Sequence, residues 1–306
     1  MSLRGAQAFR SVISLLVVLA AAGIGLWTLE APSAATGLLR VTFIDVGQGD
    51  AAWLSTPDGW DILIDGGTQS HGPGLVAYLQ GQGVTDIEVL ILTHPHADHV
   101  GGLVTVLQDM EVDEALTNCQ AYSSATYQTF LDLLASKAIS TTCVLEGDTF
   151  AWGTDVSATA VNPPQPPMSG TGSDANNNSV VLRISYDSVD FLFAGDVESG
   201  AEAAILGRGP TLEAEILKVA HHGSNSSSTG ALLTAVGPEE AVVSVGASNP
   251  YGHPAYQALE RVSAAGAATY RTDLHGTILV ETDGSTYLVE PERHLYIFLP
   301  LGLRSS

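Results

Sequence analysis

One short segment of the sequence concentrates side chains that can bind metal ions: His94, His96, Asp98 and His99. The apolar run Val89–Thr93 predicts a strand before this cluster, and Gly101 and Gly102 are expected to open an amphipathic helix after it. The cluster is therefore expected on the turn between them, where side chains two or three residues apart can converge. Imidazole and carboxylate groups bind zinc, manganese and iron. The segment predicts a metal site.

A weak internal repeat places aspartates at the ends of two further strands. Residues 61–65 (DILID) and 190–196 (DFLFAGD) each complete a predicted hairpin whose last strand leads to an aspartate. The position of Asp65 and Asp196 matters because ligands of layered α/β folds collect at strand ends. A coincidental pair of hairpins would give the same pattern.

The rest of the chain alternates short β-rich runs with helical patterns, which is typical of a layered α/β domain. Strands are expected at Val41–Val46, Ala51–Ser55, Ile62–Ile64, Val89–Thr93, Val112–Leu116, Val156–Val161, Val180–Tyr186, Phe191–Ala194, Ile216–Val219, Ala241–Val245, Thr269–Tyr270, Thr277–Glu281 and Tyr287–Glu290. Helices are expected at residues 73–82, 101–109, 124–137, 198–206, 228–236 and 255–265. The segment 162–178, rich in Pro, Gly, Ser and Asn, is expected to be a loop. No linker is evident, so residues 36–306 are expected to form one domain.

The spacing of the first cluster resembles the signature of the metallo-β-lactamase superfamily. This resemblance implies a four-layer αββα sandwich made of two similar halves, which would explain the internal repeat. It also implies that His94 and His96 help to hold one metal ion. Asp98 and His99 would help to hold a second ion.

Later residues match the rest of that superfamily's site. Asp196 matches an aspartate that bridges both ions, and His221 or His222 matches a histidine that completes the second site. Asp65 matches an aspartate that supports the ligands without coordinating. Because adjacent side chains diverge along a strand, we expect one of His221 and His222 to ligate and the other to face substrate or support the ligands.

A closer resemblance is to the extracellular hydrolase domain of ComEC-type competence proteins. It consists of five blocks in the same order and spacing: 43–50 (FIDVGQGD), 92–99 (LTHPHADH), 178–182 (NSVVL), 220–228 (AHHGSNSSS) and 249–254 (NPYGHP). The resemblance covers roughly residues 41–290 and implies nuclease activity on one strand of DNA outside the membrane. Full competence proteins also carry a channel domain of many spans, so a channel protein is an expected partner here.

One departure from the lactamase pattern concerns the first metal site. Lactamases have a histidine a few residues before the strand that starts here at Ser179, but this chain has DANNN at residues 174–178. An asparagine oxygen or a water molecule would fill that corner, which favours manganese or magnesium over zinc. We expect Asn178 to support the site. The expected cofactors are one or two divalent ions, zinc or manganese.

The expected reaction is metal-assisted hydrolysis, in which a metal-activated hydroxide attacks the substrate. Asp98 and Asp196 are expected to orient that hydroxide, and His253 to lie near the leaving group. Ser224 and Ser226 are expected to open a helix whose amides hold a phosphate, which favours a phosphodiester substrate; simple helix capping is the alternative. Structural roles are expected for the remaining histidines: His71, His275 and His294.

The charge of the chain limits how DNA could be held. The 306 residues include 33 acids against 11 Lys and Arg, a formal net charge of −22, which argues against a general polyanion-binding surface. Two other functions therefore stay open. One is hydrolysis of a smaller ester, such as a cell-surface phosphoester or a lactone. The other is an inactive, metal-binding subunit that docks on a membrane channel.

The first 35 residues differ from the rest of the chain. Arg4 and Arg10 precede an uncharged run over residues 11–29, which as a helix would span about 28 Å, close to the thickness of a hydrocarbon core. Residues 1–35 are therefore expected to be a signal peptide or membrane anchor, an apolar helix before an exported domain.

Cys119 and Cys143 lie in the exported part, where a disulfide is permitted. Two buried free thiols are the alternative.

Overall fold

Two β-sheets lie at the centre of the computed structural model, which describes residues 37–293. The first sheet has the strand order β15-β14-β1-β2-β3-β4-β5-β6. Its strands are β1 (Leu39–Phe43), β2 (Ala52–Ser55), β3 (Asp61–Ile64), β4 (Asp86–Leu92), β5 (Glu111–Thr117), β6 (Ser140–Cys143), β14 (Ile278–Thr282) and β15 (Tyr287–Pro291). The second sheet has the order β13-β12-β11-β10-β9-β8-β7. Its strands are β7 (Thr149–Trp152), β8 (Val156–Asn162), β9 (Val181–Tyr186), β10 (Val189–Phe193), β11 (Ile216–Lys218), β12 (Glu240–Val243) and β13 (Ala268–Arg271).

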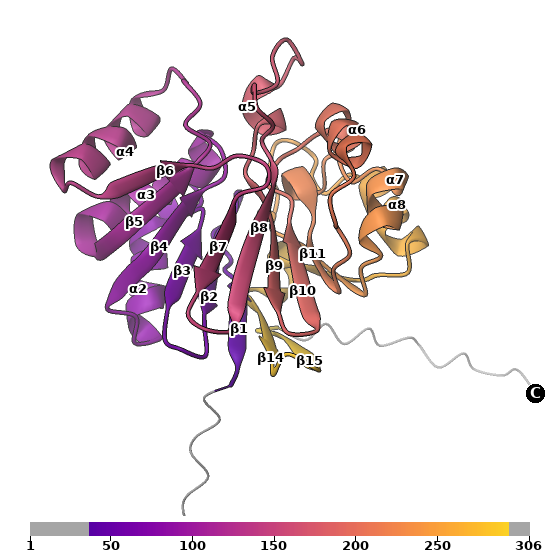
Figure 1. Cartoon of the computed structure of the whole chain (residues 1–306). Helices are drawn as coiled ribbons and strands as arrows, with labels where there is room; N and C mark the ends of the chain where they lie inside the picture. Colours follow the sequence, from indigo (N-terminus) through magenta and orange to yellow (C-terminus); the bar gives the residue numbers. More distant parts are fainter. Residues whose placement is uncertain (1–36, 294–306) are drawn as a thin grey trace, which may run out of the picture. The chain divides into compact units, whose positions relative to one another are not determined.

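Helices cover the outer face of each sheet (Figure 1). The first sheet is covered by α2 (Gly72–Gly81), α3 (Ala97–Asp109) and α4 (Ala125–Ser136). The second is covered by α6 (Ser199–Arg208), α7 (Gly230–Val236) and α8 (Tyr256–Ala264). Shorter helical segments are η1 (Gln69–His71), α5 (Asp174–Asn177), η2 (Ala220–Gly223) and α9 (Thr272–His275). The expected αββα sandwich is confirmed.

The strands are apolar on both faces because each sheet packs against its partner sheet on one side and helices on the other. In β3, Ile62 and Ile64 belong to the core between the sheets, whereas Leu63 packs against the helices over the first sheet. Across the central core, the rings of Phe43 and Phe193 stack with centroids 5.6 Å apart. Burial of such a side chain contributes roughly 1.5–3 kcal/mol. Three layers of core therefore fix the loops at the strand ends.

Parallel pairing explains why the site residues lie at one edge. β3 and β4 are parallel in the first sheet, and β10, β11 and β12 are parallel in the second. The carboxyl ends of parallel strands meet at the same edge, so the loops after them lie side by side. The predicted ligands all follow such strand ends.

Helix α3 begins earlier than expected. It starts at Ala97, so Asp98 and His99 lie in its first turn and not on a turn before it. Gly101 and Gly102 weaken the helical pattern, so the start of this helix that is predicted from the sequence is too late. Gly102 is required for packing, since a Cβ there would collide with the carbonyl of Gly66.

Strands β6 and β7 were not expected either. All four side chains of β6 are exposed, and β7 buries only Trp152. An edge strand of this kind lacks the apolar alternation that identifies a strand in the sequence. Both strands complete the sheets at their edges without contributing to the site.

Several predictions about the chain ends lie outside the described residues. They concern the apolar helix within residues 1–35 and His294. Among residues 37–293, no helix is long and apolar enough to cross a membrane.

The two cysteines do form a disulfide, with an S–S distance of 1.98 Å between Cys119 and Cys143. It links the loop after β5 to the end of β6.

Candidate metal centre

The histidine cluster lies where β4 passes into α3. His94 follows β4, and His96 is the N-cap residue of α3, with extended backbone angles of φ −69° and ψ 152°. His94 and His99 are fully buried, and His94 Nε2 lies 3.0 Å from His96 Nδ1. Asp98 occupies the first turn of α3, where a carboxylate is favoured by the helix dipole. The local chain alone thus places all four predicted side chains at one strand end.

Asp65 packs directly against His99 from the end of β3. Its Oδ2 lies 2.8 Å from His99 Nδ1, and Thr93 donates to both carboxylate oxygens, from its amide at 2.8 Å and its hydroxyl at 2.6 Å. This contact occupies Nδ1 of His99 and leaves Nε2 facing Asp196, 3.3 Å away. Carboxylates in such positions fix the orientation of metal-binding imidazoles.

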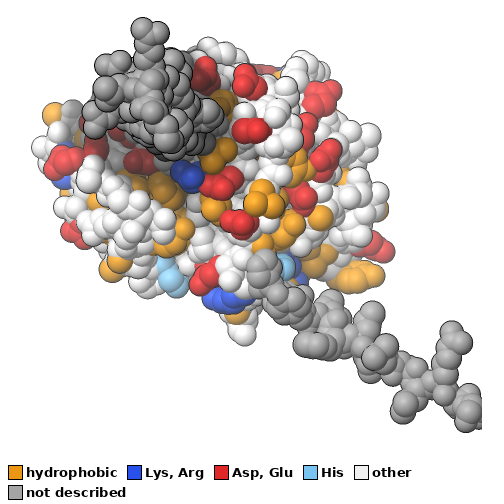
Figure 2. Space-filling view, turned by 90° about the horizontal axis from the view of Figure 1, so that it is seen from below, with side chains coloured by type: hydrophobic (Ala, Val, Ile, Leu, Met, Phe, Trp, Pro, Cys, Tyr) orange, Lys and Arg blue, Asp and Glu red, His pale blue; other side chains and the backbone are white. Residues whose placement is uncertain are grey.

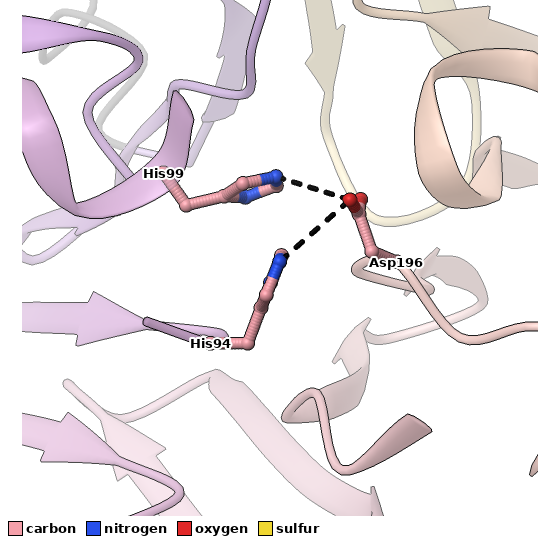
Figure 3. A group of neighbouring side chains, drawn as sticks. All are labelled: His94, His99 and Asp196. Carbon is pink, nitrogen blue, oxygen red and sulfur yellow. Dashed lines mark ion pairs between the residues drawn. The ribbon is translucent and has the colours of Figure 1, made fainter. Parts of the chain in front are cut away.

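Asp196 lies at the centre of the site, with His94 and His99 directed toward it (Figure 3). Its Oδ2 lies 3.3–3.8 Å from a ring nitrogen of four histidines: His94, His99, His221 and His222. Gly195 fixes the turn before it, because at φ 51° an added Cβ would come within 2.7 Å of Ser179. Donor atoms from both halves of the sandwich thus converge on one carboxylate oxygen.

His221 and His222 both face Asp196, so the divergence expected along a strand does not occur, and which of the two ligates stays a prediction. β11 ends at Lys218, and the two histidines lie in η2 with left-handed backbone angles, φ 51° and 53°. The strand alternation that would separate them therefore does not apply. Their Nε2 atoms lie 3.8 and 3.6 Å from Asp196 Oδ2. His222 Nε2 also lies 3.3 Å from Asp98 Oδ2, which groups it with the second predicted metal position.

Sequence reasoning missed Asp50 and Lys218. Asp50 precedes β2 and Lys218 ends β11, so their 2.7 Å ion pair joins the two halves, and both residues are almost fully buried. The other oxygen of Asp50 lies 3.1 Å from His222 Nδ1, which is also 3.0 Å from the carbonyl oxygen of Ser244. These acceptors orient His222 with Nε2 toward the centre. The block FIDVGQGD, which ends on Asp50, was the available signal.

The buried carboxylates control the protonation of the histidines. Burial opposes protonation of His222, but Asp196 and Asp50 outweigh it and raise its pKa to about 10. Asp196 also outweighs burial at His99, whose pKa lies well above its ordinary value. By contrast, burial and the neighbouring charge of His99 hold the pKa of His94 well below its ordinary value. The pKa of Asp196 is well below its usual range because these histidines outweigh its burial, so it is ionised at neutral pH.

The donor atoms fit divalent metal ions. Asp196 Oδ1, His99 Nε2 and His222 Nε2 are buried and make no hydrogen bond with the described part of the chain. Ligand atoms of His94, His99 and Asp196 lie within 4.8 Å of one another, and so do those of Asp98, His99 and His222. Buried polar atoms without partners cost free energy that a bound cation offsets. Mixed nitrogen and oxygen donors of this kind suit zinc, manganese or iron.

The predicted Asn178 does not line the site, whereas Asn176 of the same asparagine run does. The side-chain amide of Asn178 bonds to the backbone of Met168 and Asp174 at 2.8 Å, so it holds its own loop together. Asn176 instead lines the cavity beside the histidines and is 4% exposed. Its Oδ1 accepts no hydrogen bond from residues 37–293. The sequence could not choose among three adjacent asparagines because the short helix α5 decides which one turns inward.

The prediction that Ser224 and Ser226 open a helix is wrong. Helix α7 begins at Gly230, and two backbone amides just before it donate to the carboxylate of buried Glu202. The anion position at this helix is therefore taken by a side chain of the protein. The hydroxyls of Ser224 and Ser226 pair with each other at 2.9 Å.

A cavity of about 340 Å³ opens in front of the ligands. His253 lines it, with its ring centroid 5.6 Å from that of His221, and the Asn249 side chain bonds to the backbone of His253. Burial and the neighbouring histidines lower the pKa of His253, so it is neutral at pH 7. Two other histidines hydrogen bond within their own turns, away from this cavity: His71 and His275.

Comparison with known proteins identifies the family. A family model described as the metallo-beta-lactamase superfamily matches residues 44–247. The chain belongs to this superfamily. Consistent with that, its fold resembles CmlA, a diiron beta-hydroxylase from Streptomyces venezuelae, with a TM-score of 0.51 and 14% identity over 79% of this chain and 53% of that one. As a superfamily member, the protein is a metal-dependent hydrolase, and its His and Asp cluster offers ligand groups for a divalent metal ion.

Two relatives of this metallo-β-lactamase-fold hydrolase are competence proteins. ComE operon protein 3 of Bacillus subtilis (strain 168) is 28% identical over 256 residues, covering 78% of this chain and 32% of the relative. Competence protein ComA of Neisseria gonorrhoeae is 31% identical over 241 residues, covering 78% of this chain and 31% of the relative. The chain thus spans about a third of the length of each. The predicted similarity to ComEC-type competence proteins is confirmed.

Proposed function

We propose that this hydrolase is a phosphodiesterase that cleaves nucleic acid outside the membrane. The observation that carries the proposal is the position of Asp196 between two groups of ligand atoms, one with His94 and His99 and one with Asp98 and His222. Two adjacent divalent ions, when bound, activate water and stabilise the attacking and leaving oxygens of a phosphodiester. The relative from Neisseria gonorrhoeae is named a competence protein, which supports nucleic acid as the substrate.

The protein's own residues would position the reactants. Asp98 and Asp196 are ionised at neutral pH, because neighbouring histidines outweigh burial and lower the pKa of each carboxyl. Both can therefore accept hydrogen bonds from an attacking water. His253 is a neutral imidazole on the cavity wall, so it can exchange a proton with the leaving oxygen.

We also propose that residues 1–35 direct the hydrolase out of the cytoplasm or anchor it in the membrane, and that a separate channel protein is its partner. The disulfide between Cys119 and Cys143 supports an exported location, because such bonds persist in oxidising compartments. Protease accessibility of the domain in intact cells would test the location.

The test of function uses the full-length chain, with metal content measured by elemental analysis. Hydrolysis of bis(p-nitrophenyl) phosphate and of single-stranded DNA is then followed with added Mn²⁺ or Zn²⁺. His96→Ala and Asp196→Asn are expected to lose more than about 100-fold in kcat/KM, because even outer-shell partners of metal ligands are worth about 10- to 100-fold. Asp132→Asn, on the exposed face of α4, is the matched control and keeps full activity.

Two outcomes would contradict the proposal. Metal binding without cleavage of either substrate would favour a lactone or another small ester, or an inactive docking subunit. Equal activity in wild type and Asp196→Asn would show that the cluster is not the reaction centre.

A further inference from the structure

Two exposed tyrosines lie beside the metal centre. Tyr122 is 41% exposed, and its ring meets that of His96 edge-on with centroids 5.3 Å apart. Tyr251 is 66% exposed and stacks on His253, with centroids 5.9 Å apart and planes 20° apart. Exposed aromatic rings lose contact with water when a ligand covers them. Their place next to two predicted site histidines points to ligand binding.

The space between the tyrosines is continuous with the metal centre. Tyr251 lines the 340 Å³ cavity in front of the ligands, and Tyr122 lines a neighbouring cavity of about 640 Å³. His96 lines both cavities, so it marks where they meet. The second cavity continues between the loop after β5 and the loop before α5. A ligand longer than one small ester can therefore cross the centre.

The cavities offer little electrostatic attraction to a polyanion. Among the described residues that line these two cavities, none is Lys or Arg, whereas Asp98, Asp174 and Asp196 are present. Figure 2, which views the molecule from below and so from the side away from α5, also shows many acidic side chains and few Lys and Arg side chains. Apart from the metal ions proposed at the centre, a nucleic acid held here must gain affinity from something other than cationic contacts to its phosphates. Base stacking on aromatic rings is such a source, at about 1–3 kcal/mol per base.

We propose that Tyr122 and Tyr251 are stacking platforms for bases on either side of the phosphate that is cleaved in a single-stranded nucleic acid. The inference rests on the proposed phosphodiesterase function and adds the residues and the strand state. A single strand is required because the faces of duplex bases are already covered by their neighbours. Stacking is tolerant of sequence, so cleavage would show little base preference.

The test compares three substrates with the full-length chain and Mn²⁺. They are a single-stranded 20-nucleotide DNA, the same length of strand without bases, and bis(p-nitrophenyl) phosphate. Tyr122→Ala and Tyr251→Ala are each expected to raise KM for the DNA about 5- to 100-fold, the range that corresponds to one lost stacking contact. Tyr122→Phe and Tyr251→Phe keep the ring and are expected to restore KM to within about twofold. Tyr256→Ala, which removes a 74% exposed tyrosine outside both cavities, is the control.

The readouts separate this inference from the function on which it rests. Cleavage of bis(p-nitrophenyl) phosphate by the wild type supports the phosphodiesterase whatever the tyrosines do. An unchanged KM for DNA in both alanine variants, or equal KM values for DNA with and without bases, would overturn the stacking inference alone. Failure of the wild type to cleave any of the three substrates would overturn both.

Discussion

The two halves of the sandwich supply the metal centre in different ways. The first half contributes one continuous segment, His94 to His99, at a single junction between a strand and a helix. The second half contributes residues from three separate loops, with Asp196 after β10, the histidines of η2 after β11, and His253 after β12. In the first half, local chain geometry brings the ligands together, and Asp65 at the end of β3 also orients His99. In the second half, contacts between distant segments must do so.

The pair formed by Asp50 and Lys218 shows this dependence. Asp50 belongs to the first half, yet it contacts both Lys218 and His222 of the second half. The second half therefore relies on a side chain from the other sheet to orient one of its ligands. The three predictions below test whether distant contacts matter more in the second half than in the first.

The largest effect is expected for Lys218→Met. It leaves the buried carboxylate of Asp50 without its cation, which costs about 3–5 kcal/mol in the free energy of unfolding. Lys137→Met is the first-half control, because within residues 37–293 the Lys137 side chain donates only to the carbonyl of Met110, at 3.3 Å, and its loss should cost less than about 1 kcal/mol. Urea unfolding measures both. Equal losses in the two variants would remove the proposed difference between the halves.

A smaller effect is expected from opening the disulfide in the first half. Replacing Cys119 and Cys143 by serine releases a loop of 24 residues, which lowers the free energy of unfolding by about 3 kcal/mol. Mn²⁺ affinity, measured by titration calorimetry, should change by less than about threefold because the His94–His99 segment is held locally. A tenfold loss of affinity would show that the first half also depends on distant contacts.

The last prediction concerns pH. The pKa of His222 is raised to about 10, so its contribution to stability is complete below its ordinary pKa of 6.5 and is lost as pH rises through about 10. Chelator-treated protein should therefore have a lower Tm at pH 10 than at pH 6.5, and His222→Gln should flatten that dependence. His94→Gln is the control, because the lowered pKa of His94 keeps it neutral throughout this range. An unchanged slope in His222→Gln would contradict the assignment.

The sequence predicts the first half of the site well for the same reason that this half is locally held. Four ligand-type residues within six positions converge on one strand end whatever the rest of the fold does. The αββα architecture is also predictable, because buried strands and amphipathic helices have different periods. Predicted helix boundaries are wrong where a glycine such as Gly102 allows close packing and does not mark the end of a helix.

The second half is harder to predict because its geometry depends on backbone conformation and distant partners. The spacing of residues in the sequence could not show that the strand ends before His221 and His222, or that both side chains face the carboxylate of Asp196. Spacing also could not select Asn176 over Asn178, since a short helix and its loop contacts make that choice. The start of α7 was misplaced because the buried carboxylate of Glu202 comes from another helix.

The left-handed backbone at His221 and His222 limits how this enzyme can change. A residue with a side chain pays roughly 1–2 kcal/mol for that conformation, whereas glycine adopts it freely. Glycine would relieve that backbone cost, but it would remove an imidazole from the centre and, at His222, a buried partner of Asp50 and Asp196. The two histidines therefore hold a backbone conformation that costs stability in order to place both rings at the centre.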